Sequence, residues 1–162
     1  HAPGTQRTAE IRTITPVLDP SGKPIAVLGI AADAAADFAQ VAPFVLSLAS
    51  TRMREILAGW PGPHTWALPA APDCPTWLTG AHDSLAVRVT AHPVAAALCR
   101  AAGMPLVSTS ANRAGRPPAR SALQVRLRCG ADVDLIVNGA TGGLTRPTAI
   151  RDGRTGRLLR QG

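Results

Sequence analysis

A run of short polar side chains lies near the middle of the sequence, between an apolar segment and a turn. It reads Ser108-Thr109-Ser110-Ala111-Asn112. In an extended chain Ser108 and Ser110 project to the same side, and the turn that follows can bring Asn112 beside them. Two hydroxyls and an amide at a strand end suit recognition of a nucleotide or another small polar ligand. The alternative is an ordinary strand-end turn, because Ser and Asn are common in turns.

Arg88 is a second candidate, because it is a charged residue inside an otherwise apolar segment. Residues 84–90 (SLAVRVT) predict a strand on which Leu85, Val87 and Val89 face one way and Arg88 faces the other. A partly buried guanidinium needs an anionic partner. That partner is either a structural Asp or the carboxylate or phosphate of a ligand.

The positive charge of the chain is concentrated in its C-terminal half. The 162 residues include 17 basic and 10 acidic side chains, and residues 1–87 carry a net charge of −2 whereas residues 88–162 carry +9. Lys23 is the only Lys, and the planar guanidinium of Arg suits carboxylates and phosphates. An anionic partner is therefore expected. Basicity alone does not distinguish a nucleotide from RNA or a membrane surface, and a GC-rich coding sequence also favours Arg over Lys.

Several classes of protein are excluded by what the sequence lacks. It contains no GxxxxGK[ST] loop, no GxGxxG after a strand, no GxSxG elbow and no HExxH. Its three cysteines form no CxxC or Cys/His spacing, which argues against a disulfide framework or a zinc site and fits a reducing cytoplasm. The sequence also lacks a cluster of acidic residues that would indicate a metal site built from protein ligands alone. The apolar stretch 24–50 is interrupted by Asp33 and Asp37, so no membrane span is predicted.

Strands and helices alternate along a chain that has the size of one domain. Strands are predicted at residues 24–31, 64–70, 84–90, 105–109 and 133–138. Helices are predicted from about Asp33, over 51–59, over 92–103 with Pro93 in the first turn and Gly103 closing it, and from near Ser121. Residues 148–152 and 157–161 are expected to pair as a hairpin, which makes the sheet mixed. In this hairpin Arg160 is the arginine placed to point at a ligand.

Four segments together resemble the YrdC-like domain family. They are PLVSTSAN (105–112), SLAVRVTAHPVAAALC (84–99), WPGPHTWALP (60–69) and TGGLTRPTAIRDGRTGRLLRQG (141–162). Their order and spacing are similar over roughly residues 23–162, and the nearest resemblance is to the small bacterial L-threonylcarbamoyl-AMP synthases of the TsaC type. The resemblance implies an α/β (α+β) fold, an open twisted mixed sheet flanked by helices, with a positively charged depression.

The resemblance also implies a reaction and a set of binding residues. The family condenses L-threonine, bicarbonate or CO2, and ATP into threonylcarbamoyl-adenylate and pyrophosphate, and partner proteins pass the threonylcarbamoyl group to tRNA. By motif, the residues expected at ATP are Ser84, Ser110, Asn112 and Arg160. Those expected at L-threonine are Arg88, Ser108 and Thr148. No further catalytic residue is expected, because positioning and charge neutralisation supply most of the catalysis, and Mg²⁺ would be bound through the ATP phosphates.

The N-terminal residues 1–22 depart from the family pattern. Synthases of this type carry a YPTE-like motif and a KxR motif there, yet this sequence contains no Tyr. With Lys23 aligned to the lysine that opens the next strand, the KxR positions fall on Val17 and Asp19, and an Asp reverses the local electrostatics. We therefore expect residues 1–22 to be an unmatched lead-in, truncated or altered, that leaves an exposed sheet edge and a half-open pocket.

Two alternatives to an active synthase remain open at this stage. One is a non-catalytic RNA-binding module that uses the basic half as an electrostatic surface. Against it, the sequence offers few aromatic side chains for base stacking, namely two Phe and three Trp. The other is the YrdC-like segment of a larger carbamoyl-transferring maturation protein, which the absence of zinc motifs disfavours. A cytoplasmic location is expected for each.

Overall fold

The computed structural model describes residues 17–18, 24–25, 27–31, 34–113, 115–144 and 146–161. Its main sheet has six strands in the spatial order β6-β3-β5-β4-β7-β8. The strands are β3 (Val27–Ala31), β4 (Thr65–Pro69), β5 (Ser84–Thr90), β6 (Leu106–Ser108), β7 (Ile150–Asp152) and β8 (Leu158–Arg160). Two short strands, β1 (Val17–Leu18) and β2 (Pro24–Ile25), form a separate antiparallel pair.

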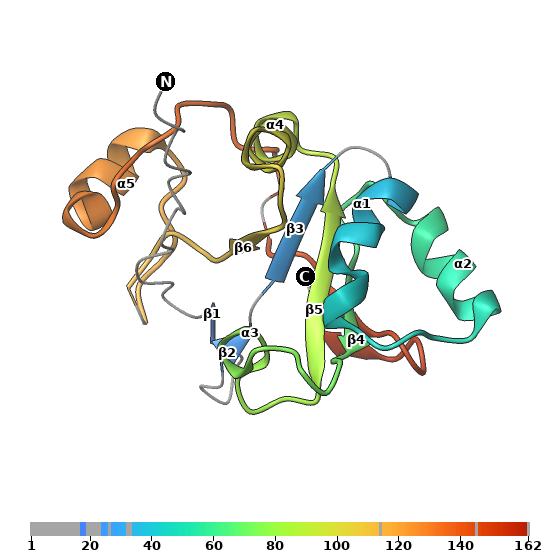
Figure 1. Cartoon of the computed structure of the whole chain (residues 1–162). Helices are drawn as coiled ribbons and strands as arrows, with labels where there is room; N and C mark the ends of the chain where they lie inside the picture. The colour runs from blue at the N-terminus through green and yellow to red at the C-terminus, as the bar shows by residue number, and fades with distance from the viewer. Residues whose placement is uncertain are drawn as a thin grey trace, which may run out of the picture.

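The main sheet is mixed, as the sequence predicts. β3 runs parallel to β5 and β4 runs parallel to β7, whereas the other neighbouring pairs are antiparallel. The helices are α1 (Ala34–Val41), α2 (Ser50–Ala58), α3 (Thr76–Thr79), α4 (Pro93–Ala102) and α5 (Ala122–Cys129), with 3₁₀ turns η1 (Ala42–Phe44) and η2 (Gly130–Asp132). Figure 1 shows α1 and α2 together on one side of the sheet, and α4 and α5 toward the other. The predicted fold class is confirmed.

The central strand β5 separates an apolar face from a polar one. Leu85, Val87 and Val89 are buried and belong to the main core cluster, which includes Val41 of α1 and Ile56 of α2. The residues between them therefore face the opposite side of the sheet. The predicted alternation along this strand is confirmed, and it places Arg88 away from the core.

Helix α4 lies on the polar side and begins and ends where the sequence predicts. Ala96 and Cys99 pack with Leu106 of β6 in a second, smaller apolar cluster. Pro93 is the first helical residue, and its missing N–H costs nothing there. Gly103 ends the helix in the left-handed region at φ 64°, which glycine adopts without strain.

Two expectations about the elements need correction. The single strand expected over residues 24–31 is two strands, β2 and β3, which belong to different sheets. The strand predicted at residues 133–138 is absent. A mostly apolar segment forms a strand only where a neighbour completes its backbone hydrogen bonds, and among the described residues no strand pairs with this segment. Its Leu135 is accordingly 79% exposed, as is Leu127 of the nearby α5 at 77%.

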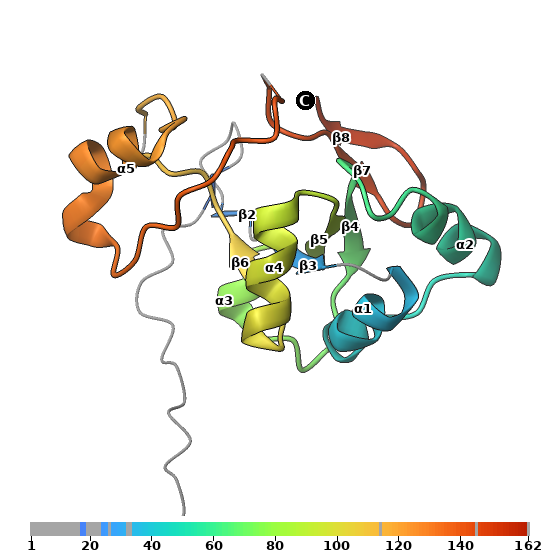
Figure 2. The ribbon, with the colours of Figure 1, turned by 90° about the horizontal axis from the view of Figure 1, so that it is seen from above.

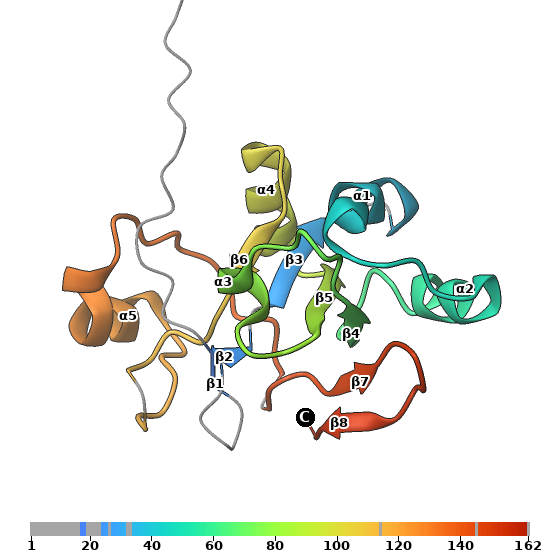
Figure 3. The ribbon, with the colours of Figure 1, turned by 60° about the horizontal axis from the view of Figure 1, so that its bottom comes forward.

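Figures 2 and 3 show the position of α5 relative to the sheet. The helix stands off from the six strands, on the far side of β6 from β3. It begins at Ser121, whose hydroxyl accepts a hydrogen bond from the Gln124 N–H at 3.2 Å, as expected of an N-cap. None of the helices in the described part of the chain is both long and apolar enough to cross a membrane.

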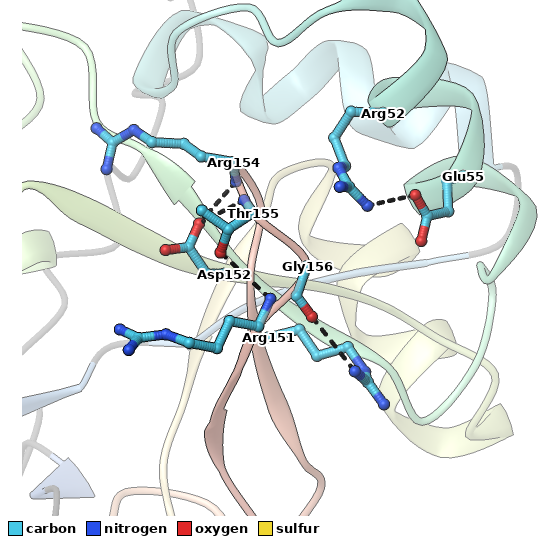
Figure 4. Close-up of polar contacts among 8 residues, drawn as sticks. Arg52, Glu55, Arg151, Asp152, Arg154, Thr155 and Gly156 are labelled. Carbon is cyan, nitrogen blue, oxygen red and sulfur yellow. Dashed lines mark hydrogen bonds and ion pairs between the residues drawn. The ribbon is translucent and has the colours of Figure 1, made fainter.

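The β7–β8 hairpin is held by its turn (Figure 4). The Oδ1 atom of Asp152 accepts hydrogen bonds from the backbone N–H groups of Arg154, at 2.7 Å, and Thr155, at 3.2 Å. Arg151 donates to the carbonyl of Gly156, which adopts a φ of 77°. This network fixes the return of the chain and thereby the position of β8.

The same turn lies against α2. A Cβ atom on Gly156 would come within 3.1 Å of Arg52 Nη1, and Arg52 itself is paired with Glu55. Strand β8 then returns so that Arg160 lies opposite Ile150. The hairpin therefore delivers Arg160 to the neighbourhood of the residues that precede β7.

Candidate functional site

Arg88 lies in the middle of β5 with its guanidinium half-buried on the polar side of the sheet. Its strand neighbour on β3 is Gly29, which carries no side chain. Arg88 Nη1 donates a hydrogen bond of 3.4 Å to the hydroxyl of Thr148, and Arg88 Nε is buried without a hydrogen-bond partner. Burial lowers the pKa of Arg88, because the charged form is partly removed from water.

Arg160 reaches the same residue from the last strand. Its Nη2 donates to the carbonyl oxygen of Thr148 at 3.0 Å, and its Nε is also buried without a partner. Burial lowers the pKa of Arg160 as well. Two partly desolvated guanidinium groups therefore converge on Thr148, one at its hydroxyl and one at its carbonyl.

The described residues supply no carboxylate for either arginine. Their ion pairs are Arg52–Glu55, Arg113–Asp132 and Arg154–Asp83, all of them elsewhere on the molecule. Of the two partners open to Arg88 at the sequence level, a structural Asp is therefore not found in the described part of the chain. Two desolvated cations without a counter-ion favour binding of an anion.

A cavity of about 470 Å³ opens beside Arg88. This volume is within the range of small-molecule sites. Its lining residues come from the end of β5, the start of α4 and two loops, and they are Gly62, Pro63, Arg88, Thr90, Ala91, His92, Pro93, Ala95, Gly142 and Leu144. The cavity therefore combines one buried cation with a largely apolar wall.

His92 fixes one wall of this cavity. Its Nδ1 accepts from the Ala95 N–H at 3.4 Å, and its Nε2 lies 2.9 Å from the Ala140 carbonyl oxygen. Because Nδ1 accepts, Nε2 carries the proton and donates it to Ala140. The loop approaches closely enough that a Cβ on Gly142 would lie 2.8 Å from His92 Cδ2. His92 thus joins the start of α4 to the loop that closes the cavity.

Ser84 and Ser108 lie on the same face of the sheet as Arg88. Ser108 is level with Val27 of β3, which in turn is level with Ala86 of β5. Residues paired across strands share a face, as do residues two apart along a strand. Ser108 is two strands from β5, about 10 Å away. Both serines are half-buried.

Ser110 and Asn112 lie in the turn beyond β6, outside the hydrogen-bonded group around Thr148. The Asn112 N–H donates to the Ser110 carbonyl at 2.9 Å, and the Asn112 amide donates to the Arg113 carbonyl at 3.1 Å. Asn112 Oδ1 is buried without a partner, so this acceptor is available to a ligand donor. The side-chain amide of Asn112 contacts Arg113 rather than Ser108 or Ser110, and Ser110 itself is exposed.

The sequence interpretation missed Thr65 and His92. The Thr65 hydroxyl lies 3.1 Å from the Thr148 hydroxyl, and Thr65 is only 1% exposed. The available signal was a polar residue at the start of an apolar strand, two residues after Pro63, and for His92 a polar residue directly before the helix-starting Pro93. The predictions for residues 1–22 concern a segment of which only β1 is described, so they remain predictions.

Comparison with known proteins identifies relatives for nearly the whole chain. A family model named Sua5/YciO/YrdC, with the description "Telomere recombination", matches residues 10–162. A threonylcarbamoyl-AMP synthase of Nitrosococcus oceani is 56% identical over 126 residues, covering 78% of this chain and 68% of the relative. A threonylcarbamoyl-AMP synthase of Xanthomonas campestris pv. campestris is 47% identical over 155 residues, covering 96% of this chain and 81% of the relative.

Solved structures share the fold. P. abyssi Sua5 complexed with L-threonine superposes with a TM-score of 0.68 at 26% identity, covering 79% of this chain and 36% of that one. E. coli YciO superposes with a TM-score of 0.70 at 24% identity, covering 86% of this chain and 66% of that one. The present chain therefore corresponds to about a third of the Sua5 chain and to most of the shorter bacterial relatives.

Proposed function

Because the chain belongs to the Sua5/YciO/YrdC family, we propose that it is a threonylcarbamoyl-AMP synthase. The structural observation that carries this proposal is the convergence of Arg88 and Arg160 on Thr148 without a carboxylate partner in the described part of the chain. A substrate that carries a carboxylate and meets a phosphate chain would supply the missing negative charge. L-threonine and ATP have those two groups.

The reaction forms one bond to phosphorus and breaks another. The amine of L-threonine combines with bicarbonate to give a carbamate and water, and a carbamate oxygen then attacks the α-phosphate of ATP. Pyrophosphate leaves with the electron pair of the broken P–O bond. The carboxylate, the carbamate and the triphosphate are all anionic, so the protein must hold like charges together. Positioning and charge neutralisation therefore account for most of the catalysis, without a covalent nucleophile.

We assign the binding residues by combining motif and geometry. For L-threonine, Arg88 would bind the carboxylate, with Thr148 and Ser108 as hydroxyl partners on the same side of the sheet. For ATP, the residues are Ser84, Ser110, Asn112 and Arg160. The buried acceptor of Asn112 supports its place in this group, because an amino or hydroxyl group of the nucleotide would satisfy it.

Mg²⁺ would enter the site bound to ATP, as part of the substrate. Within the described residues no group of three His, Cys, Asp or Glu side chains is placed to hold a metal ion. A Mg²⁺ ion commonly keeps several water ligands and binds through substrate phosphates, which asks little of the protein.

The proposed setting is the cytoplasm, where other proteins would transfer the threonylcarbamoyl group to tRNA. A non-catalytic RNA-binding role is not favoured. RNA recognition by charge uses exposed cations that follow a phosphate backbone, whereas Arg88 and Arg160 are partly buried around one threonine. Any contact with RNA would use exposed arginines, such as those of residues 113–128, rather than Arg88 and Arg160.

Pyrophosphate release by the purified chain tests the activity. Release should require L-threonine, bicarbonate and ATP together, and threonylcarbamoyl-adenylate should appear in equal amount by mass spectrometry. D-threonine serves as the matched control, since it has the same charges in the wrong arrangement. Pyrophosphate release that is independent of L-threonine would contradict the proposed function.

A further inference from the structure

Thr65 lies on a strand next to both parts of the chain that form the proposed threonine site. Strand β4 lies between β5, which carries Arg88, and β7, which begins two residues after Thr148. Thr65 is the first residue of β4 and is level with Ile150 of β7. Its hydroxyl lies 3.1 Å from the hydroxyl of Thr148, 83 residues further along the chain.

The hydrogen bonds around Thr148 constrain which way its hydroxyl proton points. A hydroxyl has one proton to donate and two lone pairs with which to accept. Arg88 Nη1 can only donate, so the Thr148 oxygen accepts from it at 3.4 Å. Either threonine could donate in the Thr65–Thr148 bond. Two arrangements are therefore possible, and they differ in what Thr148 can offer to a ligand.

In the first arrangement Thr65 donates to Thr148. Both lone pairs of Thr148 are then occupied, by Arg88 and by Thr65, and its O–H is left to donate to an anion. In the second arrangement Thr148 gives its proton to Thr65 and has none for a ligand. An anion beside Arg88 attracts the free O–H and so selects the first arrangement.

We propose that Thr65 is a positioning residue, which donates its proton to Thr148 and so directs the Thr148 O–H, together with Arg88, at the carboxylate of L-threonine. This inference rests on the proposed function. Thr65 is 1% exposed and acts through Thr148 rather than by touching the substrate. Thr65 is thereby a further determinant of specificity for L-threonine, and it lies on a strand, β4, that carries none of the predicted binding residues.

A purely structural role is the competing explanation, because a buried hydroxyl needs a partner wherever it lies. Two substitutions separate the explanations. Thr65→Val keeps the shape and removes the hydroxyl, whereas Thr65→Ser keeps the hydroxyl. A structural role changes the free energy of unfolding but leaves substrate affinities alone. A positioning role changes the affinity for L-threonine and is rescued by Thr65→Ser.

The test is calorimetric titration of the whole chain with L-threonine, and separately with ATP, alongside urea unfolding. We expect Thr65→Val to weaken L-threonine binding up to about 10-fold, consistent with the loss of the neutral hydrogen bond that orients Thr148, and to leave ATP binding within twofold. Thr65→Ser should stay within about threefold of the unmodified chain. Thr79→Val is the control, because Thr79 is also buried and its hydroxyl donates to the Gly80 carbonyl, at 3.5 Å, away from Thr148.

A double-substitution cycle with Thr148→Val gives a second, independent readout. If Thr65 acts only through Thr148, Thr65→Val should add nothing to the affinity lost in Thr148→Val. Because this comparison is made between Thr148→Val and the double variant, it remains available if Thr65→Val alone folds poorly. Equal L-threonine affinity for Thr65→Val and the unmodified chain, or fully additive losses in the cycle, would overturn the positioning role alone. Failure of the unmodified chain to bind L-threonine would overturn both it and the proposed function.

Discussion

Replacing Arg88 by Met should weaken L-threonine binding without destabilising the protein. Arg88→Met keeps the length of the side chain and its packing against the sheet but removes the charge. In the free protein the guanidinium has a buried Nε without a partner and a 3.4 Å hydrogen bond to Thr148. The substitution therefore removes a partly buried charge for which the described residues supply no carboxylate.

The size of the affinity loss follows from the charge pair that the substitution removes. A carboxylate about 4 Å from the guanidinium gains about 4 kcal/mol at an effective dielectric constant of about 20. Desolvation of both groups offsets much of this, and hydrogen bonds to charged groups contribute about 1.5–3 kcal/mol net. The dissociation constant for L-threonine should therefore rise by a factor of about 10 to 150. Arg160 remains close by and favours the lower part of this range.

Although Arg88→Met weakens binding, the free energy of unfolding should not fall. Replacing buried charges with apolar side chains of similar volume is often neutral or stabilising. We expect Arg88→Met to leave the free energy of unfolding unchanged or to raise it by about 1 kcal/mol. Titration calorimetry with L-threonine and urea unfolding of the same preparation measure both quantities.

Arg157→Met is the matched control, because Arg157 is an exposed arginine between β7 and β8. It should change neither quantity appreciably. An affinity loss of less than about threefold in Arg88→Met, or an equal loss in Arg157→Met, would refute the assignment of Arg88. A loss of stability above about 2 kcal/mol would show instead that the guanidinium is satisfied within the folded chain.

Three further predictions concern the cavity wall, the hairpin and a buried thiol. Gly142→Ala should weaken L-threonine binding in calorimetry, because its Cβ would meet His92 at 2.8 Å and push the loop off α4; unchanged affinity would show that the wall is not needed. Asp152→Ala should lower the free energy of unfolding in urea by about 1–2 kcal/mol through the loss of two backbone hydrogen bonds, whereas Asp83→Ala, which breaks an exposed ion pair, should cost less than about 1 kcal/mol. Burial raises the pKa of the Cys74 thiol, so the unfolded chain loses this proton at a lower pH than the folded one. The stability that the thiol contributes is therefore complete below about pH 8.5 and declines as the pH rises through the folded pKa. A Cys74→Ala variant with the same pH slope in urea unfolding would argue against this.

Local signals predicted those elements whose ends are set by their own residues. Pro93 and Gly103 delimit α4 because one lacks an N–H and the other accepts a positive φ, and neither property depends on the rest of the fold. Alternation along residues 84–90 likewise placed Arg88 opposite the core, since strand geometry fixes the side on which each residue lies.

Features that depend on partners distant in the sequence could not be read in this way. The mostly apolar residues 133–138 are typical of a strand, but no neighbouring strand in the described part of the chain completes it. The contact of Thr65 with Thr148 depends on the order β5-β4-β7, and the reach of Arg160 to Thr148 depends on the register of the last hairpin. Neither order nor register can be deduced from the residues themselves.

Titration with L-threonine and with L-threoninamide tests directly the proposal that Arg88, beside the Thr148 hydroxyl, binds the carboxylate of L-threonine. The two ligands share the side chain and the amine, but the amide lacks the negative charge. We expect measurable binding of L-threonine and binding of L-threoninamide that is at least about 10-fold weaker. Equal affinity for the two ligands would contradict it.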